Sequence, residues 1–147
     1  HGRDVYAYTG ARLASGQITF EQVGKKLRSK VEMIPYQKPK LEKNVLYGNI
    51  PILDVQYGNV WTNIDRETVG KLNLKKGDIF NVEIYNKDKL VFKDKIPFAN
   101  SFGDVPEDKN MMYFNSLDSL SFAVNMGDFA SQYKIEYGGD WSVKIYK

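Results

Sequence analysis

The feature that most constrains the fold is a succession of short segments rich in β-branched and aromatic residues, running from residue 45 to the end of the 147-residue chain. Turn signals, such as Gly58-Asn59 and Asn86-Lys87-Asp88, separate these segments. About seven short strands at this spacing are typical of a compact sandwich or barrel. The predicted strands are Val45–Asp54, Val60–Ile64, Ile79–Tyr85, Lys89–Ile96, Met111–Phe114, Leu120–Asn125 and Trp141–Tyr146.

Helical character is concentrated near the N-terminus. Gly16 interrupts the helical pattern, and Thr19 followed by Gln22 is the pattern of a capping box that starts a second segment. Residues 25–43 are basic and contain two prolines, which favours an extended linker or arm. The predicted helices are residues 5–28, Asp65–Leu72 with Asp65 as its cap, and Asp128–Tyr133.

Composition excludes several classes of function. The net charge is +3, and the lysines alternate with acidic residues, which indicates solvated faces. Only residues 25–43 approach a cluster of cations, so we expect no nucleic-acid partner. The chain has no cysteine, which excludes disulfides, thiolate chemistry and a Cys-ligated zinc site, and it has no zinc-ligand spacing. We expect no metal and no cofactor. It has no run of about 18 apolar residues, so we expect no membrane span.

The N-terminal sequence His1-Gly2-Arg3-Asp4 has no initiator methionine and no signal-like segment. We therefore expect a processed or truncated chain, or one that lacks an upstream domain. Its localisation is unknown, with the cytoplasm as the default expectation. Because His1 is the single histidine, a Ser-His-Asp triad within this chain would depend on that terminal residue. The sequence does not predict a self-contained enzyme.

The first of three unusually polar stretches spans Ile52–Ile64, at a predicted strand-turn-strand junction. Asp54 has the chemistry to hold an ammonium group, and the Asn59 amide matches the edge of adenine. Tyr57 offers a ring face for stacking or for a cation. The alternative is that Asn59 simply adopts the left-handed turn conformation after Gly58.

Two further stretches carry polar groups between predicted strands. In Tyr113–Gly127, the Ser116 hydroxyl with neighbouring backbone N–H groups is suited to a carboxylate. The alternative is a hairpin turn in which Asn115 and Ser116 satisfy local backbone groups. In Phe98–Glu107, the loop either drapes an aromatic side chain over a ligand or closes the end of a barrel.

Together these stretches resemble the S-adenosylmethionine (SAM) hydroxide adenosyltransferase family, which also includes the halide-using adenosyl synthases. Order and spacing agree over nearly the whole chain. The matching positions are Gly48-Asn49-Ile50, Asp54, Tyr57-Gly58-Asn59 and Thr62-Asn63-Ile64; then Asn115-Ser116, Ala123-Val124-Asn125, Gly127 and Ala130; and, at the N-terminus, His1-Gly2-Arg3-Asp4, Val5-Tyr6-Ala7, Leu13-Ala14 and Gly16.

The resemblance implies a subunit with an α/β N-terminal domain and a small C-terminal β-barrel. Residues 1–44 would be the end of the first domain with a helical tail and linker, and residues 45–147 would be the mainly β barrel domain. In the family, SAM binds between the N-terminal domain of one subunit and the C-terminal domain of its neighbour, usually in a trimer. We therefore expect SAM or adenosine as the small-molecule partner, with SAM as substrate, and a homotrimer with an inter-subunit active site.

The resemblance also assigns roles to individual residues. It places Asp54 on the methionine amine, Tyr57 near adenine or the sulfonium, Asn59 on the adenine edge, Phe102 against adenine, Ser116 at the carboxyl and amino end of methionine, and backbone groups near Leu117, Val124 and Met126 around the pocket. His1 matches a catalytic histidine that, with an upstream Asp and Arg, orients a water molecule. The alternative is that His1 is a fragment end or tag remnant.

The implied reaction is hydrolysis of SAM, in which water displaces methionine at C5′ of the ribose and gives adenosine and L-methionine. This chain alone is expected to be inactive, because the Asp and Arg lie upstream. Halide-using relatives tend to carry a hydroxyl residue at the Gly2 position, so Gly2 favours water. The alternatives are a halide-using synthase, a non-catalytic adenosine- or SAM-binding module, and a plain β interaction domain that uses the basic arm.

Three residues depart from the family pattern. Asp118 stands where Gly is frequent, Ser121 where Glu is common, and Asp128 where Asn is usual. We expect these positions to lie on turns or on the outer surface, with more effect on the methionine end of the pocket than on the adenine end.

Overall fold

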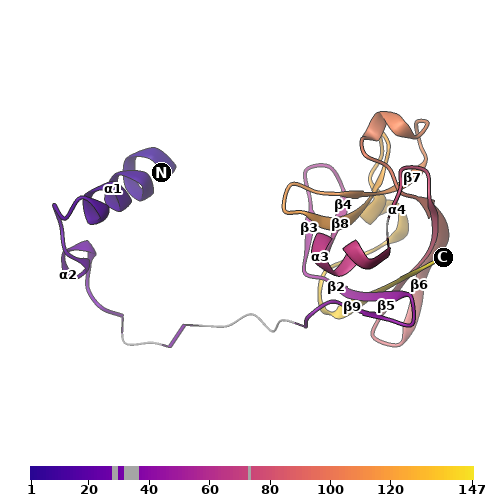
Figure 1. Cartoon of the computed structure of the whole chain (residues 1–147), viewed down its shortest axis with the longest axis horizontal. Coiled ribbons are helices and arrows are strands. Elements are labelled where there is room, and N and C mark those ends of the chain that lie inside the picture. Colours follow the sequence, from indigo (N-terminus) through magenta and orange to yellow (C-terminus); the bar gives the residue numbers. More distant parts are fainter. Residues whose placement is uncertain (28–29, 32–36, 73) are drawn as a thin grey trace. The chain divides into compact units, whose positions relative to one another are not determined.

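The chain forms two compact units, His1–Ile34 and Pro35–Lys147, each shown in Figure 1. The computed structural model describes residues 1–27, 30–31, 37–72 and 74–147. Residues 28–29 and 32–36 of the linker predicted at 25–43 lie outside the described residues, and the last part of the linker forms strand β1 (Lys40–Glu42). The family domain boundary expected at residue 44 stays a prediction.

The first unit contains short helices that expose their side chains. They are a π-helical segment η1 (Gly2–Ala7), α1 (Tyr8–Ala14) and α2 (Phe20–Val23), and none of their residues is buried. The helix predicted over residues 5–28 is therefore too long. It is interrupted at Gly16, whose φ is +73°, and the last helix ends at Val23; residue 28 itself lies outside the described residues. The predicted start at Thr19 is confirmed, since its N–H donates to the Gln22 side chain at 2.8 Å.

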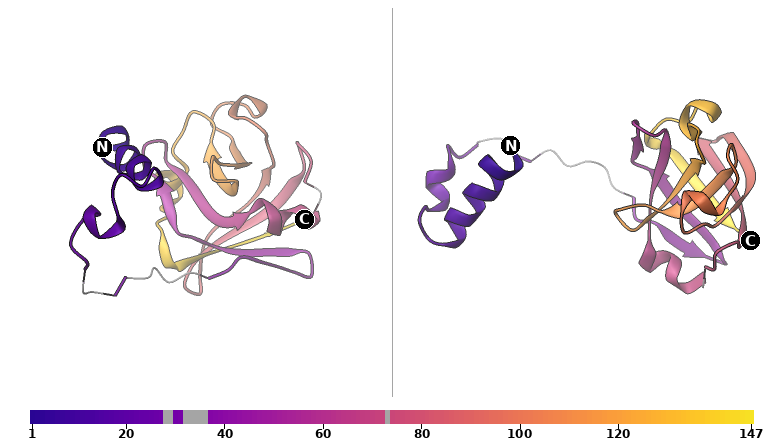
Figure 2. Two further views of the ribbon diagram at one scale, coloured as in Figure 1. Left: turned by 60° about the vertical axis from the view of Figure 1, so that its left-hand side comes forward. Right: turned by 90° about the horizontal axis from the view of Figure 1, so that it is seen from above.

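The second unit is built from two antiparallel sheets, as the alternating segments predicted (Figure 1, Figure 2). Hydrogen-bonded neighbours follow the orders β1-β2-β9-β5-β6 and β3-β4-β8-β7. The remaining strands are β2 (Val45–Ile50), β3 (Ile52–Asp54), β4 (Asn59–Asp65), β5 (Ile79–Asn86), β6 (Lys89–Pro97), β7 (Asn110–Phe114), β8 (Ser119–Val124) and β9 (Gly138–Tyr146). The short helices are α3 (Arg66–Val69), α4 (Phe129–Tyr133) and the 3₁₀ turns η2 (Gly70–Leu72) and η3 (Phe102–Asp104). None of the helices in the described ranges is long and apolar enough to cross a bilayer.

The strand predicted across Val45–Asp54 is two strands that belong to different sheets. Pro51 lies between β2 and β3, at the point where the chain leaves the first sheet and enters the second. Proline has no N–H to donate to a ladder, so a sheet corner is a position at which it is tolerated. The apolar residues of Val45–Asp54 therefore predicted extended backbone correctly, but they did not indicate that the chain changes sheets at Pro51.

The two sheets enclose one hydrophobic core, and they do not close into a barrel. On one side, β2 of the first sheet and β4 of the second form no ladder among the described strands. They are connected there by the Asn49 N–H, which donates to the Asn63 Oδ1 at 2.7 Å. On the other side, a single bridge connects Phe98 with Met112. The predicted barrel is corrected accordingly to two packed sheets. The largest fully buried side chains include Leu46, Ile50, Ile64, Phe80, Ile84, Ile96, Leu120, Phe122, Phe129 and Ile145.

Strand β4 presents one face to this core and the other away from it. Val60, Thr62 and Ile64 are buried in the core face, while Asn59 and Trp61 alternate with them. Its pairing with β8 shifts register between Trp61 and Asp65. The Thr62 hydroxyl donates to the Leu120 carbonyl at 2.7 Å and accepts from the Ile64 N–H at 3.1 Å, so polar groups at the irregularity stay paired.

The outer face of the first sheet carries a buried carboxylate, Glu83. It accepts hydrogen bonds from the hydroxyls of Tyr85 at 2.6 Å and Tyr146 at 2.9 Å, and pairs with the Lys93 ammonium at 2.8 Å. Hydrogen bonds from Lys93 and Tyr85 lower the pKa of Glu83 from 4.5 to about 2, against the opposing effect of burial. This cluster links strands β5, β6 and β9 on the side away from the core.

Glu83→Gln is expected to lower the free energy of unfolding by about 1–3 kcal/mol at pH 7, because two hydroxyls and an ammonium lose their charged acceptor. Folding lowers the pKa of Glu83, so its stabilising effect is complete above pH 4.5 and is lost as pH falls from 4.5 to about 2. Denaturant unfolding at several pH values, followed by tryptophan fluorescence, should show the difference between variant and parent shrinking over that window. Glu42→Gln, in an exposed pair with Lys40, is the matched control and should have little effect.

Candidate functional site

A cavity of about 690 Å³ opens on the face of the second sheet that points away from the core. Its volume lies within the range of small-molecule sites. The turn between β3 and β4, the loop containing η3, the β7–β8 hairpin and the turn before α4 all contribute to it. The described residues that line it are Asp54, Gln56, Tyr57, Asn59, Trp61, Phe102, Tyr113, Asn115, Ser116, Val124, Asn125, Met126, Gly127 and Asp128.

The structure brings together seven of the eight binding residues predicted from the sequence. Those seven are Asp54, Tyr57, Asn59, Phe102, Ser116, Val124 and Met126. Leu117 is not among the lining residues; it lies in the β7–β8 hairpin with 69% of its surface exposed. His1 is exposed in the first unit, and its catalytic role stays a prediction. The individual contacts to a ligand also stay predictions, although the convergence of these side chains is observed.

The turn between β3 and β4 fixes the polar end of the cavity. The N–H groups of Tyr57 and Gly58 both donate to the Asp54 carbonyl, at 3.1 and 2.8 Å. Gly58 has φ +68°, and a Cβ on it would lie 2.1 Å from the Asp128 carboxyl group. Gly58 therefore adopts the left-handed conformation, while Asn59 begins strand β4. The alternative that explained Asn59 as a left-handed turn residue is wrong.

Asp54 and Asn59 are directly paired. They lie opposite each other across the β3–β4 ladder, and the Asn59 Nδ2 donates to the Asp54 Oδ2 at 3.3 Å. Asn59 is only 4% exposed, so its amide orientation is held by burial as well as by this bond. Because Nδ2 uses one N–H on Asp54, the Oδ1 and the second N–H remain for a ligand. The carboxylate of Asp54 retains capacity to accept from an ammonium group.

The β7–β8 hairpin forms the other polar side of the cavity. The Asn115 Oδ1 accepts from the N–H groups of Leu117 at 2.8 Å and Ser119 at 3.2 Å, and its Nδ2 donates to the Ser121 hydroxyl at 2.9 Å. Asn115 thus satisfies the hairpin locally, as the alternative interpretation of this stretch predicted. Ser116, next to it, lines the cavity and remains a candidate for the carboxylate of a ligand.

Two of the three departures from the family pattern lie where they were expected. Asp118 has φ +56° in the hairpin turn, a conformation for which glycine is the usual residue. Asp128 caps helix α4 by accepting from the Ser131 N–H at 2.8 Å. Ser121 was expected on a turn or the outer surface, and this was wrong: it lies within β8 and is fully buried.

An aromatic wall covers the cavity between these polar ends. Phe102 packs on Tyr113 with ring centroids 5.3 Å apart, so the loop drapes an aromatic side chain over the cavity. Asp104 anchors this loop by accepting from the Ser101 N–H at 3.0 Å and pairing with the Lys76 ammonium at 2.6 Å, which lowers the pKa of Asp104. The remaining aromatic lining residues are Tyr57 and Trp61.

Sequence reasoning missed Trp61 and Tyr113 as lining residues. Both lay within the polar stretches already singled out, and strand periodicity would have placed Trp61 on the same face as Asn59, two residues earlier. No cluster of three or more His, Asp or Glu side chains in the described ranges is arranged to hold a metal ion.

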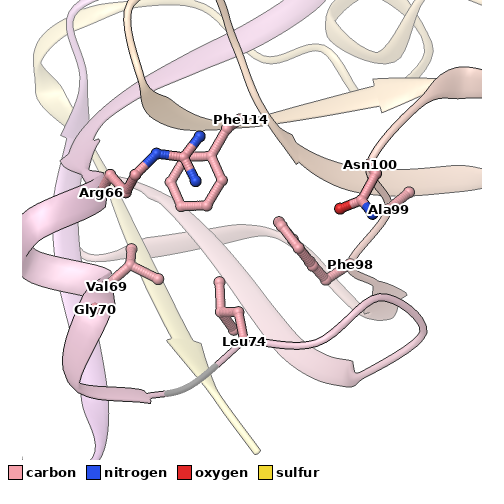
Figure 3. A pocket seen from close by; sticks show the side chains of 8 residues that line it. All are labelled: Arg66, Val69, Gly70, Leu74, Phe98, Ala99, Asn100 and Phe114. Carbon is pink, nitrogen blue, oxygen red and sulfur yellow. The ribbon is translucent and has the colours of Figure 1, made fainter.

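A second cavity, of about 430 Å³, lies beside α3 and is lined mainly by apolar side chains (Figure 3). Arg66 is the charged member of the described lining. Its guanidinium lies over the Phe114 ring, 3.9 Å from the centroid, and pairs with the Asp118 carboxylate at 2.8 Å. Because its cation is already neutralised, this cavity has weaker means of binding a polar ligand than the first.

Comparison with known proteins agrees with the position of the first cavity. Residues 48–142 match the family described as SAM hydroxide adenosyltransferase C-terminal domain, a span that includes every residue lining the cavity. The fluorinase of Actinopolyspora mzabensis is 30% identical over 141 residues, covering 94% of this chain and 46% of the relative. The fluorinase of Nocardia brasiliensis (strain ATCC 700358 / HUJEG-1) is 28% identical, covering 99% of this chain and 48% of the relative.

Solved structures agree with these matches. An uncharacterized conserved protein from Thermotoga maritima has a TM-score of 0.73 and 31% identity, covering all of this chain and 52% of its own. A conserved hypothetical protein from Thermus thermophilus has a TM-score of 0.55 and 25% identity, covering 98% of this chain and 52% of its own. The chain spans about half the length of the curated relatives it matches. Because the family match covers residues 48–142, more than half of the sequence, this chain belongs to the SAM hydroxide adenosyltransferase family and contains its C-terminal domain.

Proposed function

We propose that this protein is the SAM-binding C-terminal part of a SAM hydrolase. In the proposed reaction the oxygen of water attacks C5′ of the ribose, and the bond from C5′ to the sulfonium sulfur breaks. The electron pair of that bond stays on sulfur, methionine leaves as a neutral thioether, and the water loses one proton. The products are adenosine and L-methionine. Such a displacement needs a leaving group held in line and a desolvated nucleophile.

The observation that carries this proposal is the convergence of the matching side chains on one cavity with polar groups at both ends. In the proposed complex, Asn59 pairs with the adenine edge and Phe102 packs against the base. Asp54 accepts a hydrogen bond from the methionine ammonium group, and Ser116 contacts the carboxyl and amino end of the methionine. The aromatic wall between them limits access of water, which strengthens each polar contact to the ligand.

The proposal includes a second protein surface that completes the site. The chain spans about half the length of its curated relatives, and the helices of its first unit expose Val5, Tyr6, Tyr8 and Phe20 by about half or more. Exposed apolar side chains on short helices are typical of a segment that packs against further protein. We therefore propose that the N-terminal domain of a neighbouring subunit, in a trimer, supplies the Asp and Arg that act with His1.

Water rather than halide is proposed as the nucleophile. Gly2 has no hydroxyl with which to bind a halide ion, and the His1 imidazole is suited to orient a water molecule or to accept its proton. The halide-using alternative is favoured by a different observation, the names of the two relatives described above, both of which are fluorinases. A third alternative is a module that binds adenosine or SAM without turnover.

Incubation with SAM distinguishes these functions. The full gene product is expected to release equimolar adenosine and L-methionine, with no dependence on added fluoride or chloride, while residues 1–147 alone are expected to be inactive. Chromatography of the nucleosides with mass detection is the measurement. A 5′-halogenated nucleoside that appears only with added halide would instead establish the synthase, and bound but unconverted SAM would establish the binding module.

Asn59→Ala is expected to weaken adenosine binding by about 1–3 kcal/mol, because it leaves the groups of the base edge unpaired. Isothermal titration with adenosine and inosine is the measurement. Inosine replaces the N6 amino donor by a carbonyl acceptor, so it should bind the parent more weakly than adenosine, and the variant should lose that preference. Asn81→Ala, on the other sheet, is the matched control. Equal adenosine affinity of Asn59→Ala and the parent would remove Asn59 from the site.

Asp54→Asn is expected to weaken binding of SAM by roughly 10- to 100-fold and to change adenosine binding little, because only SAM carries the ammonium group. The substitution keeps the size of the side chain and a polar partner for Asn59. Asp88→Asn, in the exposed β5–β6 turn, controls for the loss of one negative charge. Equal losses for both ligands would contradict the role given to Asp54.

A further inference from the structure

Three side chains form a row across the floor of the cavity. Trp61 of β4 is paired with Ser121 of β8, which is paired in turn with Tyr113 of β7. Residues that are opposed in neighbouring strands lie on the same face, so the indole, the hydroxyl and the phenol are neighbours. Trp61 and Tyr113 line the cavity, while Ser121 between them is fully buried.

The indole N–H of Trp61 is the unusual member of this row. Its Nε1 is buried, and it has no hydrogen-bond partner among the described residues. The Ser121 hydroxyl is already engaged, because it accepts from the Asn115 Nδ2 at 2.9 Å and donates to the Ser119 carbonyl at 3.4 Å. An unpaired buried donor costs about 1–3 kcal/mol, so a partner gained on ligand binding would be stabilising.

Tyr113 is the neighbouring group that can serve this donor. Burial raises the pKa of the Tyr113 phenol, the indole N–H of Trp61 opposes that effect, and the Asp54 carboxylate adds to it. The indole N–H thus lies near enough to the phenol oxygen to lower its pKa, although the indole meets the geometry of a hydrogen bond with no described residue. A small inward movement of the Tyr113 ring, against which Phe102 packs, would complete the bond.

We propose that Tyr113 donates a hydrogen bond to the nucleoside half of the ligand, and that the Trp61 indole N–H positions it by donating to the phenol oxygen. This inference rests on the proposed function. Once the phenol oxygen accepts from the buried indole, its own O–H is directed away from Trp61, toward the cavity. The partner would be a ribose oxygen or a base ring nitrogen, groups that SAM and adenosine share.

The assignment to the nucleoside half follows from the strand. Trp61 is two residues from Asn59 on the same face of β4, which places the Trp61 end of the row next to the proposed adenine reader. The hairpin that carries Ser116 begins at the far end of β7, beyond Tyr113. Tyr113 therefore lies between Trp61, which is next to Asn59, and the hairpin of Ser116, within reach of the ribose and base.

The two tryptophans provide a direct test, because the chain has only Trp61 and Trp141. Nitrogen-15 labelling of the full chain should give two indole N–H signals, which Trp141→Phe assigns. Titration with adenosine, and separately with SAM, should move the Trp61 signal downfield and leave the signal of Trp141, which is buried in the other sheet, in place. In Tyr113→Phe the ligand-induced shift should disappear, and the Kd for adenosine and for SAM should rise by about tenfold each.

Trp61→Phe keeps a ring in the floor and removes the donor. It should raise both Kd values by a smaller factor, and the double variant with Tyr113→Phe should bind no more weakly than Tyr113→Phe alone, because the indole acts through the phenol. A purely structural role for either residue would change the free energy of unfolding without a ligand-dependent indole shift.

The outcomes separate this inference from the proposed function. If Asn59→Ala weakens adenosine binding while Tyr113→Phe does not and the Trp61 signal stays fixed, the inference is wrong and the proposed function stands. Weakening confined to SAM would overturn the assignment to the nucleoside half. If neither ligand shifts any backbone amide of the cavity residues at millimolar concentration, the proposed function fails, and the inference fails with it.

Discussion

The candidate site depends on how strand β4 passes its irregular pairing with β8. A register shift leaves a gap in the ladder after Trp61, and the Thr62 hydroxyl occupies it by bonding both Leu120 and Ile64. This pairing satisfies the Thr62 hydroxyl on the core face of β4, between the buried Val60 and Ile64. It also leaves the opposite face free to carry Asn59 and Trp61, so the cavity floor is set by the same strand that closes the core.

The polar groups of the site are held by the protein before any ligand arrives. Asn59 is buried and bonded to Asp54, Asn115 is fully engaged within its hairpin, and Asp104 anchors the loop that carries Phe102. Preorganised groups lose little conformational freedom on binding, which favours affinity and a defined ligand pose. The Trp61 indole N–H is the exception, because its nitrogen is buried and has no hydrogen-bond partner among the described residues.

Strand periodicity and turn residues in the sequence were enough to predict most of the second unit, including the Asp65 cap and the turn after Asn86. The corner at Pro51 was missed because a run of apolar residues does not indicate which sheet each half joins. Whether the two sheets close into a barrel, and whether Ser121 is buried, depend on pairing between strands far apart in the sequence. Local sequence patterns do not contain that information. The residues proposed for binding came from the polar stretches and from the family resemblance; Trp61 was passed over because a large apolar side chain in a strand usually belongs to a core.

The tight approach of Gly58 to Asp128 bears on how this pocket can be redesigned. The Gly58 carbonyl accepts from the Ala130 N–H at 2.9 Å, and no side chain fits between the β3–β4 turn and the cap of α4. A combinatorial library that randomised either position would lose the backbone scaffold in most members. A library that keeps Gly58 and Asp128 and varies Tyr57, Met126 and Val124 would change the shape of the cavity only. Variants with altered nucleoside preference could then be selected among proteins that still fold.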